Sequence, residues 1–144
     1  MWCHVSKKVD LNAKFLDPKA DGGIDVEKLL LQAFLQRVVN GGGYIDREYG
    51  LGRRRTDLLI RKPLTDHYGG PIQRVVMELK ILRGSLESTI ADGLRQTSDY
   101  MDIAISVDEG HLIIFDRSKT RSWDERIWHR PYEHEGHTIM VWGM

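Results

Sequence analysis

Two segments of the sequence decide how the rest of the chain is interpreted: Glu48-Tyr-Gly-Leu-Gly-Arg-Arg-Arg-Thr-Asp57 and Val75-Val-Met-Glu78-Leu-Lys80. Each has the apolar residues of a β-strand, with charged side chains set among them. Glu78 and Lys80 are two residues apart, so both side chains point to the same face of a strand. We therefore predict that the apolar residues alternating with them fill the opposite face: Val75, Met77, Leu79 and Ile81.

Charged side chains in a strand that is buried on both faces need partners or a chemical role. Asp57, Glu78 and Lys80 on adjacent strands would form a small acidic cluster beside one cation. Such a cluster can hold a divalent metal ion and position a water near a phosphodiester. The same residues could instead form a structural ion pair between Lys80 and either carboxylate, and these two segments alone leave both interpretations open.

The composition is that of an ordinary globular domain. A chain of 144 residues can bury a single core, and its contents of 41% hydrophobic and 29% charged residues are typical of such domains. No apolar run approaches the ~20 residues that cross a bilayer, so no membrane segment is expected. Cys3 is the only cysteine, which excludes an internal disulfide and a cysteine zinc cluster.

The N-terminal residues predict location and domain limits. Residues 1–8 lack the apolar region of a signal peptide, so a cytoplasmic location is expected. Residues 1–23 are mostly polar and end in Asp21-Gly22-Gly23, which indicates a lead-in or linker segment. Residues 24–144 form the predicted domain.

Positive charge is concentrated around the two deciding segments. The formal net charge is zero, which argues mildly against a dedicated nucleic-acid binder. Residues 47–83, however, contain nine basic and four acidic residues, and this local excess can form a basic face on a neutral protein. Arg53, Arg55 and Arg83 are the candidate nucleic-acid contacts, although the same arginines could equally form a solvated surface.

The first half of the domain predicts one helix and three strands. Residues 24–40 have apolar residues at three- and four-residue steps, numerous enough to predict a mostly buried helix that ends at Asn40. Strands are predicted over residues 44–49, 54–61 and 73–82. The close spacing of the last two favours an antiparallel meander.

The second half predicts a helix followed by more strands. Ser85 is the expected N-cap of a helix that ends near Asp102 or Ile103. Residues 110–115 form a short apolar strand, and residues 116–124 are polar and predicted to be a loop. Residues 127–128 and 137–142 predict a final hairpin, separated by Pro131 and a charged turn over residues 133–136. The fold class is therefore α/β, with helices packed against a mixed central sheet.

At this point the chain resembles the PD-(D/E)XK nuclease superfamily. Its restriction-endonuclease-like core is an α-β-β-β-α-β unit with an Asp on the second strand and Glu-x-Lys on the third, and Asp57 and Glu78-Leu79-Lys80 match these positions. Gln96-Thr-Ser-Asp-Tyr100 supplies the Gln-x-x-x-Tyr that many branches carry on the following helix. Three segments are also similar to the nuclease-like domain often found C-terminal to AAA-type ATP-binding proteins: residues 51–60, 77–82 and 110–117.

The resemblance implies a role for each matching residue. Asp57 and Glu78 would coordinate Mg²⁺, with Mn²⁺ as a substitute, and Lys80 would orient the attacking water and offset charge on the phosphate. Gln96 and Tyr100 would support the site or touch the phosphate backbone. Alternatively, Gln96 and Tyr100 form a helix face that is hydrogen-bonded into the fold.

A third acidic ligand has two candidates. Members of the superfamily often place a Glu on the first helix, and Glu27 is the candidate there. Glu27 could also be only a favourable acid at a helix N-terminus, and Glu48 on the neighbouring strand is the rival ligand.

The expected function is Mg²⁺-dependent hydrolysis of phosphodiester bonds in DNA. An alternative is a catalytically inactive module of the same fold that binds nucleic acid or regulates an associated ATPase. A third is a pure assembly domain that uses the terminal tryptophan-containing hairpin as its interface. DNA, an ATPase domain or subunit, and a second copy in a homodimer are the expected partners, and the sequence leaves the form of the nucleic acid open.

Overall fold

The structure is a computed structural model, and it describes residues 25–38, 42–51, 54–66, 69–104 and 106–144. Of residues 25–28, 38, 47–51 and 54–55 only the backbone is described. The elements in chain order are α2 (Asp25–Val38), β1 (Tyr44–Leu51), β2 (Arg54–Pro63), β3 (Ile72–Ile81), α3 (Leu86–Ile103), β4 (Glu109–Phe115), α4 (Trp123–Arg126), β5 (Trp128–His134) and β6 (His137–Gly143).

The strands form one six-stranded mixed sheet in the order β1-β2-β3-β4-β6-β5. β1, β2 and β3 pair antiparallel as the predicted meander. β3 pairs parallel with β4 after the α3 crossover, β4 pairs parallel with β6, and the β5–β6 hairpin closes the far edge. The α/β class, the mixed sheet and the element order from the first helix to β4 are confirmed.

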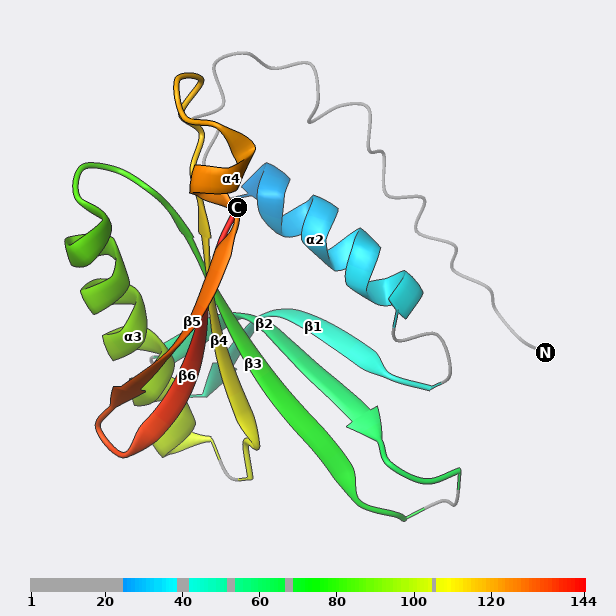
Figure 1. Ribbon diagram of the computed structural model, residues 1–144. Coiled ribbons are helices and arrows are strands. Elements are labelled where there is room, and N and C mark those ends of the chain that lie inside the picture. The colour runs from blue at the N-terminus through cyan, green and yellow to red at the C-terminus, as the bar shows by residue number, and fades with distance from the viewer. Residues whose placement is uncertain (1–24, 39–41, 52–53, 67–68, 105) are drawn as a thin grey trace.

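The two long helices cover opposite faces of this sheet (Figure 1). On one face, Ile90 and Leu94 of α3 pack against residues of β4 and β6, including the fully buried Leu112. On the other face, Leu31 and Leu35 of α2 pack against a cluster that contains Leu79. The alternation of side chains along the central strands thus fills two apolar layers, one on each side of the sheet.

The helix α2 is less buried than its sequence predicts. Leu31 and Leu35 face the sheet, but Leu30 and Phe34 are 61% and 64% exposed. A single helix can turn only one side toward a sheet, so Leu30 and Phe34 on its other side stay exposed. The predicted end of this helix at Asn40 lies outside the described residues.

The C-terminal part differs from its prediction in two places. The expected loop over residues 116–124 ends in the one-turn helix α4, which begins after the N-cap Ser122. The final hairpin exists, but β5 runs through Pro131 because it is an edge strand, where a missing backbone N–H is tolerated. The turn is only Glu135-Gly136, and both residues have the positive φ of a tight two-residue hairpin turn.

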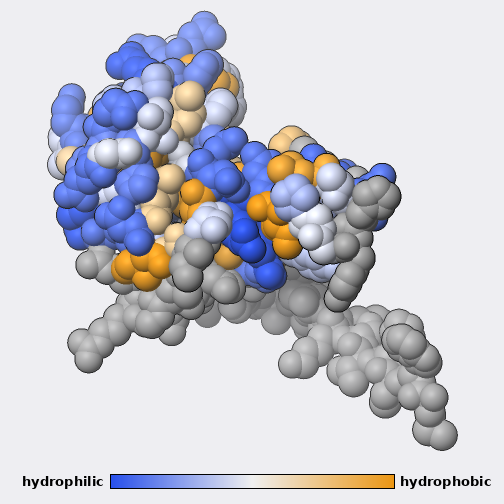
Figure 2. All heavy atoms as spheres, turned by 90° about the horizontal axis from the view of Figure 1, so that it is seen from below, coloured by the Kyte–Doolittle hydropathy of each residue, from blue (hydrophilic) through white to orange (hydrophobic). Residues whose placement is uncertain are grey.

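The surface is mixed in character. On the side of the molecule seen from below, hydrophobic residues lie in small groups between hydrophilic ones (Figure 2). Within the described residues, no helix combines the length and the apolar character required to cross a membrane.

Candidate functional site

Asp57 and Glu78 come together because β2 and β3 are paired. Leu58 lies opposite Met77. Asp57 comes just before Leu58 and Glu78 just after Met77, so the two acids are neighbours on the antiparallel strands. Leu58 and Met77 belong to the apolar cluster on the α2 face of the sheet, so the acids point to the α3 face. Glu78 is buried, and Asp57 is partly buried and accepts the Leu79 N–H at 2.9 Å through its Oδ2.

Lys80 lies on the same face, two residues further along β3. Its ammonium donates a hydrogen bond to Gln96 Oε1 at 2.6 Å and forms an ion pair with Asp92 Oδ2 at 3.1 Å. Glu78 Oε1 is 3.9 Å away, so an ion pair between Lys80 and Glu78, which the sequence leaves open, is present but long. The side chain is 22% exposed, which leaves the cation between the sheet and α3 with limited access to solvent.

Asp92 belongs to this site and was missed by the sequence prediction. Its Oδ1 accepts from Arg95 at 2.8 Å, and its Oδ2 accepts from the Gln96 side-chain amide at 3.2 Å in addition to pairing with Lys80. The hydrogen bond from Arg95, followed by that from Lys80, lowers the pKa of Asp92 below its ordinary value of 3.8. Asp92 is four residues before Gln96, so the helix period would have placed both on one face.

Gln96 and Tyr100 occupy different surroundings although they lie on one helix face. Gln96 contacts both Lys80 and Asp92, so it is part of the charged cluster. Tyr100 is 2% exposed and packs in an apolar cluster with Leu59 and Val76. The Tyr100 side chain is therefore buried beneath the site, and its role as a support or as a phosphate contact stays a prediction.

The remaining predicted residues are placed only in part. Glu27 lies in the first turn of α2 and Glu48 lies in β1, but their side chains are outside the description. Arg53 is outside the described residues, Arg55 is described by its backbone in β2, and Arg83 is exposed just after β3. The arginines therefore stay candidates for nucleic-acid contact.

A metal ion at this site would have two described carboxylate ligands. Among the described side chains, no group of three or more His, Cys, Asp or Glu residues could hold a metal. Mg²⁺ commonly takes one or two protein carboxylates and keeps several waters, so Asp57 and Glu78 fit its requirements as a partial ligand set. A third carboxylate ligand would have to come from side chains outside the description, such as those of Glu27 and Glu48.

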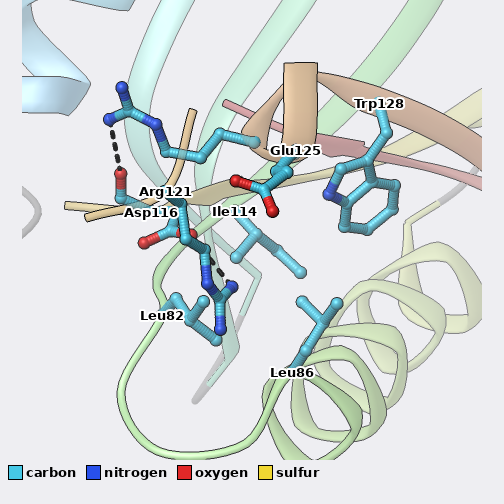
Figure 3. Close-up of a pocket in the computed structure, with 9 residues that line it drawn as sticks. Leu82, Leu86, Ile114, Asp116, Arg121, Glu125 and Trp128 are labelled. Carbon is cyan, nitrogen blue, oxygen red and sulfur yellow. Dashed lines mark hydrogen bonds and ion pairs between the residues drawn. The ribbon is translucent and has the colours of Figure 1, made fainter. Parts of the chain in front are cut away.

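A small cavity lies on the α3 face near the carboxyl end of β4 (Figure 3). Leu82, Leu86, Ile114 and Trp128 line it, and the Arg121 guanidinium lies over it while paired with Asp116 at 3.1 Å. Its volume is about 40 Å³, whereas ligand pockets span roughly 300–1,000 Å³. The cavity can hold ordered water or a very small group, and it is too small for a nucleobase.

Comparisons of the chain with protein-family models, curated proteins and solved structures found no match.

Proposed function

We propose that this chain is a metal-dependent nuclease that hydrolyses phosphodiester bonds in DNA. The observation that carries the proposal is the meeting of Asp57, Glu78 and Lys80 on one face of two paired strands, under a helix that supplies Gln96. Two carboxylates with a cation beside them suit the chemistry of a phosphodiester better than that of an uncharged substrate. The α-β-β-β-α-β order of elements supports membership of the restriction-endonuclease-like fold.

Each residue has a separate task in this proposal. Asp57 and Glu78 would hold Mg²⁺ or Mn²⁺, which when bound supplies a Lewis acid and a more acidic water at the phosphate. The Leu79 N–H keeps the Asp57 carboxylate in a fixed orientation at the strand pair. Lys80 provides a positive charge beside the carboxylates, where it can orient a water and stabilise negative charge that develops on phosphate oxygens.

The proposal is tested by cleavage of labelled DNA. Linear duplex, single-stranded and four-way-junction substrates would be incubated with Mg²⁺ or Mn²⁺, and with EDTA as the metal-free control. Asp57→Asn, Glu78→Gln and Lys80→Met each remove one charge with little change in shape. Loss of a well-aimed electrostatic group costs roughly 100-fold or more in rate, so each variant should lose nearly all metal-dependent cleavage.

Matched controls separate the site from general effects of charge. Asp66→Asn and Lys62→Met change exposed residues in and beside the β2–β3 loop and should cleave like the wild type. Cleavage that persists in the three site variants, or that survives EDTA, would overturn the assignment.

A second candidate is a non-catalytic module that binds nucleic acid or regulates an associated ATPase. The observation that favours it is the engagement of Lys80 by Asp92 and Gln96, which occupies two of the three ammonium hydrogens that a catalytic lysine would offer to water or phosphate. In this case DNA binding would survive in Lys80→Met and no substrate would be cut. The resemblance to domains that follow AAA-type proteins makes an ATP-binding partner part of this proposal, and a homodimer remains a proposal for either function.

A further inference from the structure

The Lys80 ammonium is held unequally by three acceptors. An ammonium has three hydrogens to donate. Gln96 Oε1 at 2.6 Å and Asp92 Oδ2 at 3.1 Å both lie on α3 and within hydrogen-bonding range. Glu78 Oε1 at 3.9 Å is beyond that range, so the side of the ammonium that faces the carboxylates is the least tightly held.

The two acceptors on α3 are themselves joined. The Gln96 amide accepts from Lys80 through its oxygen and donates to Asp92 through its nitrogen, at 3.2 Å. Arg95 holds the other oxygen of Asp92 at 2.8 Å. Lys80, Asp92 and Gln96 thus form a closed ring of contacts, and Arg95 fixes that ring from outside.

This ring is poorly suited to stabilising the fold. The Asp92 side chain is 47% exposed and that of Arg95 is 58% exposed. Ion pairs at such positions contribute little to the free energy of unfolding, because water screens them and two side chains lose freedom. The main consequence of the ring is therefore the position of the Lys80 ammonium, which otherwise ends a flexible four-carbon chain.

We propose that Asp92 is a positioning residue for Lys80. With Gln96, it holds the ammonium from the α3 side and leaves its third hydrogen directed toward the carboxylates, where a water or a phosphate oxygen can accept it. The catalytic part of this inference rests on the proposed nuclease function, whereas the placement of Lys80 is independent of it. Misplacing a reactive group by about 1 Å can cost about 100-fold in rate, so such a restraint has a measurable effect.

The first test measures the placement of Lys80 without any substrate. The full chain would be treated with a limiting amount of an amine-acylating reagent, and the labelling rate of each lysine followed by mass spectrometry. Asp92→Ala should label Lys80 several-fold faster than the wild type. Asp92→Asn keeps an acceptor oxygen and should label Lys80 at close to the wild-type rate. The exposed Lys62 and the variant Glu87→Gln, an exposed acid in the first turn of α3, are the controls for general effects.

The second test measures the consequence for DNA cleavage. Asp92→Ala should lower kcat by about 10–100-fold with little change in KM, and Asp92→Asn should recover most of the loss. Unchanged Lys80 labelling in Asp92→Ala would overturn the positioning role, whatever the activity. Wild-type protein that cuts no DNA would overturn the proposed function, and the labelling rates would still decide the role of Asp92.

Discussion

Asp57 has a structural contact in addition to its charge. Its Oδ2 accepts the Leu79 N–H at 2.9 Å, just beyond the last paired residues of β2 and β3. Removing an acceptor from a buried backbone N–H costs about 1–3 kcal/mol. Asp57→Ala should therefore lower the free energy of unfolding by about this amount, and Asp57→Asn by less because its amide oxygen can still accept.

Urea unfolding of the two variants would check this difference. Asn is the better substitution in activity measurements if the prediction holds, since it separates loss of charge from loss of structure. Equal stability of the Ala and Asn variants would show that the Leu79 N–H does not depend on Asp57.

The charge of Asp92 predicts a dependence of stability on pH. Arg95 and Lys80 lower its pKa in the folded protein, so the ionised carboxylate favours folding above the ordinary value of 3.8. This contribution is lost as pH falls through the lowered folded-state pKa. Because the Asp92 side chain is 47% exposed, the difference in unfolding midpoint between the wild type and Asp92→Asn should be small near pH ~7, and it should be absent near pH ~2. A difference that is equal at both pH values would mean that the charge of Asp92 is not its source.

At the residue scale, the sequence predicts the strand residues of the site but not their surroundings. The alternation around Glu78 and Lys80 is enough to put both on one face, and the structure has them there. Asp92 was missed because one acid on an amphipathic helix is indistinguishable from an ordinary exposed acid. Asp92 differs from such an acid because Lys80, on another element, contacts it, and this contact depends on tertiary packing.

At the scale of elements, α3 packs closely against β4. A Cβ on Gly93 would lie 2.5 Å from both methyl carbons of Leu112, and Leu112 is fully buried. Gly93→Ala should gain about 1 kcal/mol of helix propensity and lose about 1–3 kcal/mol through overpacking. We expect a net loss of stability, measured as a lower thermal midpoint.

A second substitution tests this cause of the loss. Leu112→Val on its own should lower the stability of the protein, because it removes a buried methylene. In combination with Gly93→Ala it should make room for the new methyl group, so the loss of stability caused by Gly93→Ala should be smaller than in the wild-type background. Additive effects of the two substitutions would contradict the close contact.

The hairpin turn gives a separate prediction at this scale. Gly136 has a φ of 82°, a conformation that costs a residue with a Cβ about 1 kcal/mol. Gly136→Ala should therefore destabilise the β5–β6 hairpin, which thermal unfolding would detect. Gly70→Ala, at a loop glycine without positive φ, is the control and should have a smaller effect.

The sequence predicts where an element begins and ends when local interactions such as helix caps set the limit. The prediction fails when packing against other elements sets it. Ser85 caps α3 as predicted, and its hydroxyl accepts the Ser88 N–H at 3.1 Å. Ser122 and Glu125 have the spacing of a capping box and could have predicted α4. The passage of β5 through Pro131 could not be predicted, because only the assembled sheet shows which strand lies at its edge.

At the scale of the whole molecule, zero net charge limits how DNA could be bound. If Arg53, Arg55 and Arg83 each neutralise one phosphate, the logarithm of the affinity should fall with the logarithm of salt concentration with a slope of about −3. Binding of the Asp57→Asn protein to a labelled duplex over a salt series would measure this slope. Arg83→Ala should reduce the magnitude of this slope by about 1. Arg130→Ala changes a residue on β5, the edge strand at the far end of the sheet from β1, and should leave the slope unchanged.

The position of β3 in the sheet also has a consequence for folding. On one side β3 pairs with β2, which is close to it in the chain, and Leu58 lies opposite Met77. On the other side β3 pairs with β4, where Lys80 lies opposite Ile114, and all of α3 separates these two residues in the chain. Contacts that close short loops form sooner, because less chain entropy is lost. During folding, the β2–β3 hairpin and the contact of α3 with Lys80 would then form before β3 pairs with β4, because Lys80 and Gln96 are 16 residues apart in the chain whereas Lys80 and Ile114 are separated by all of α3. The charged cluster can thus assemble before β4 and β6 complete the sheet beside it.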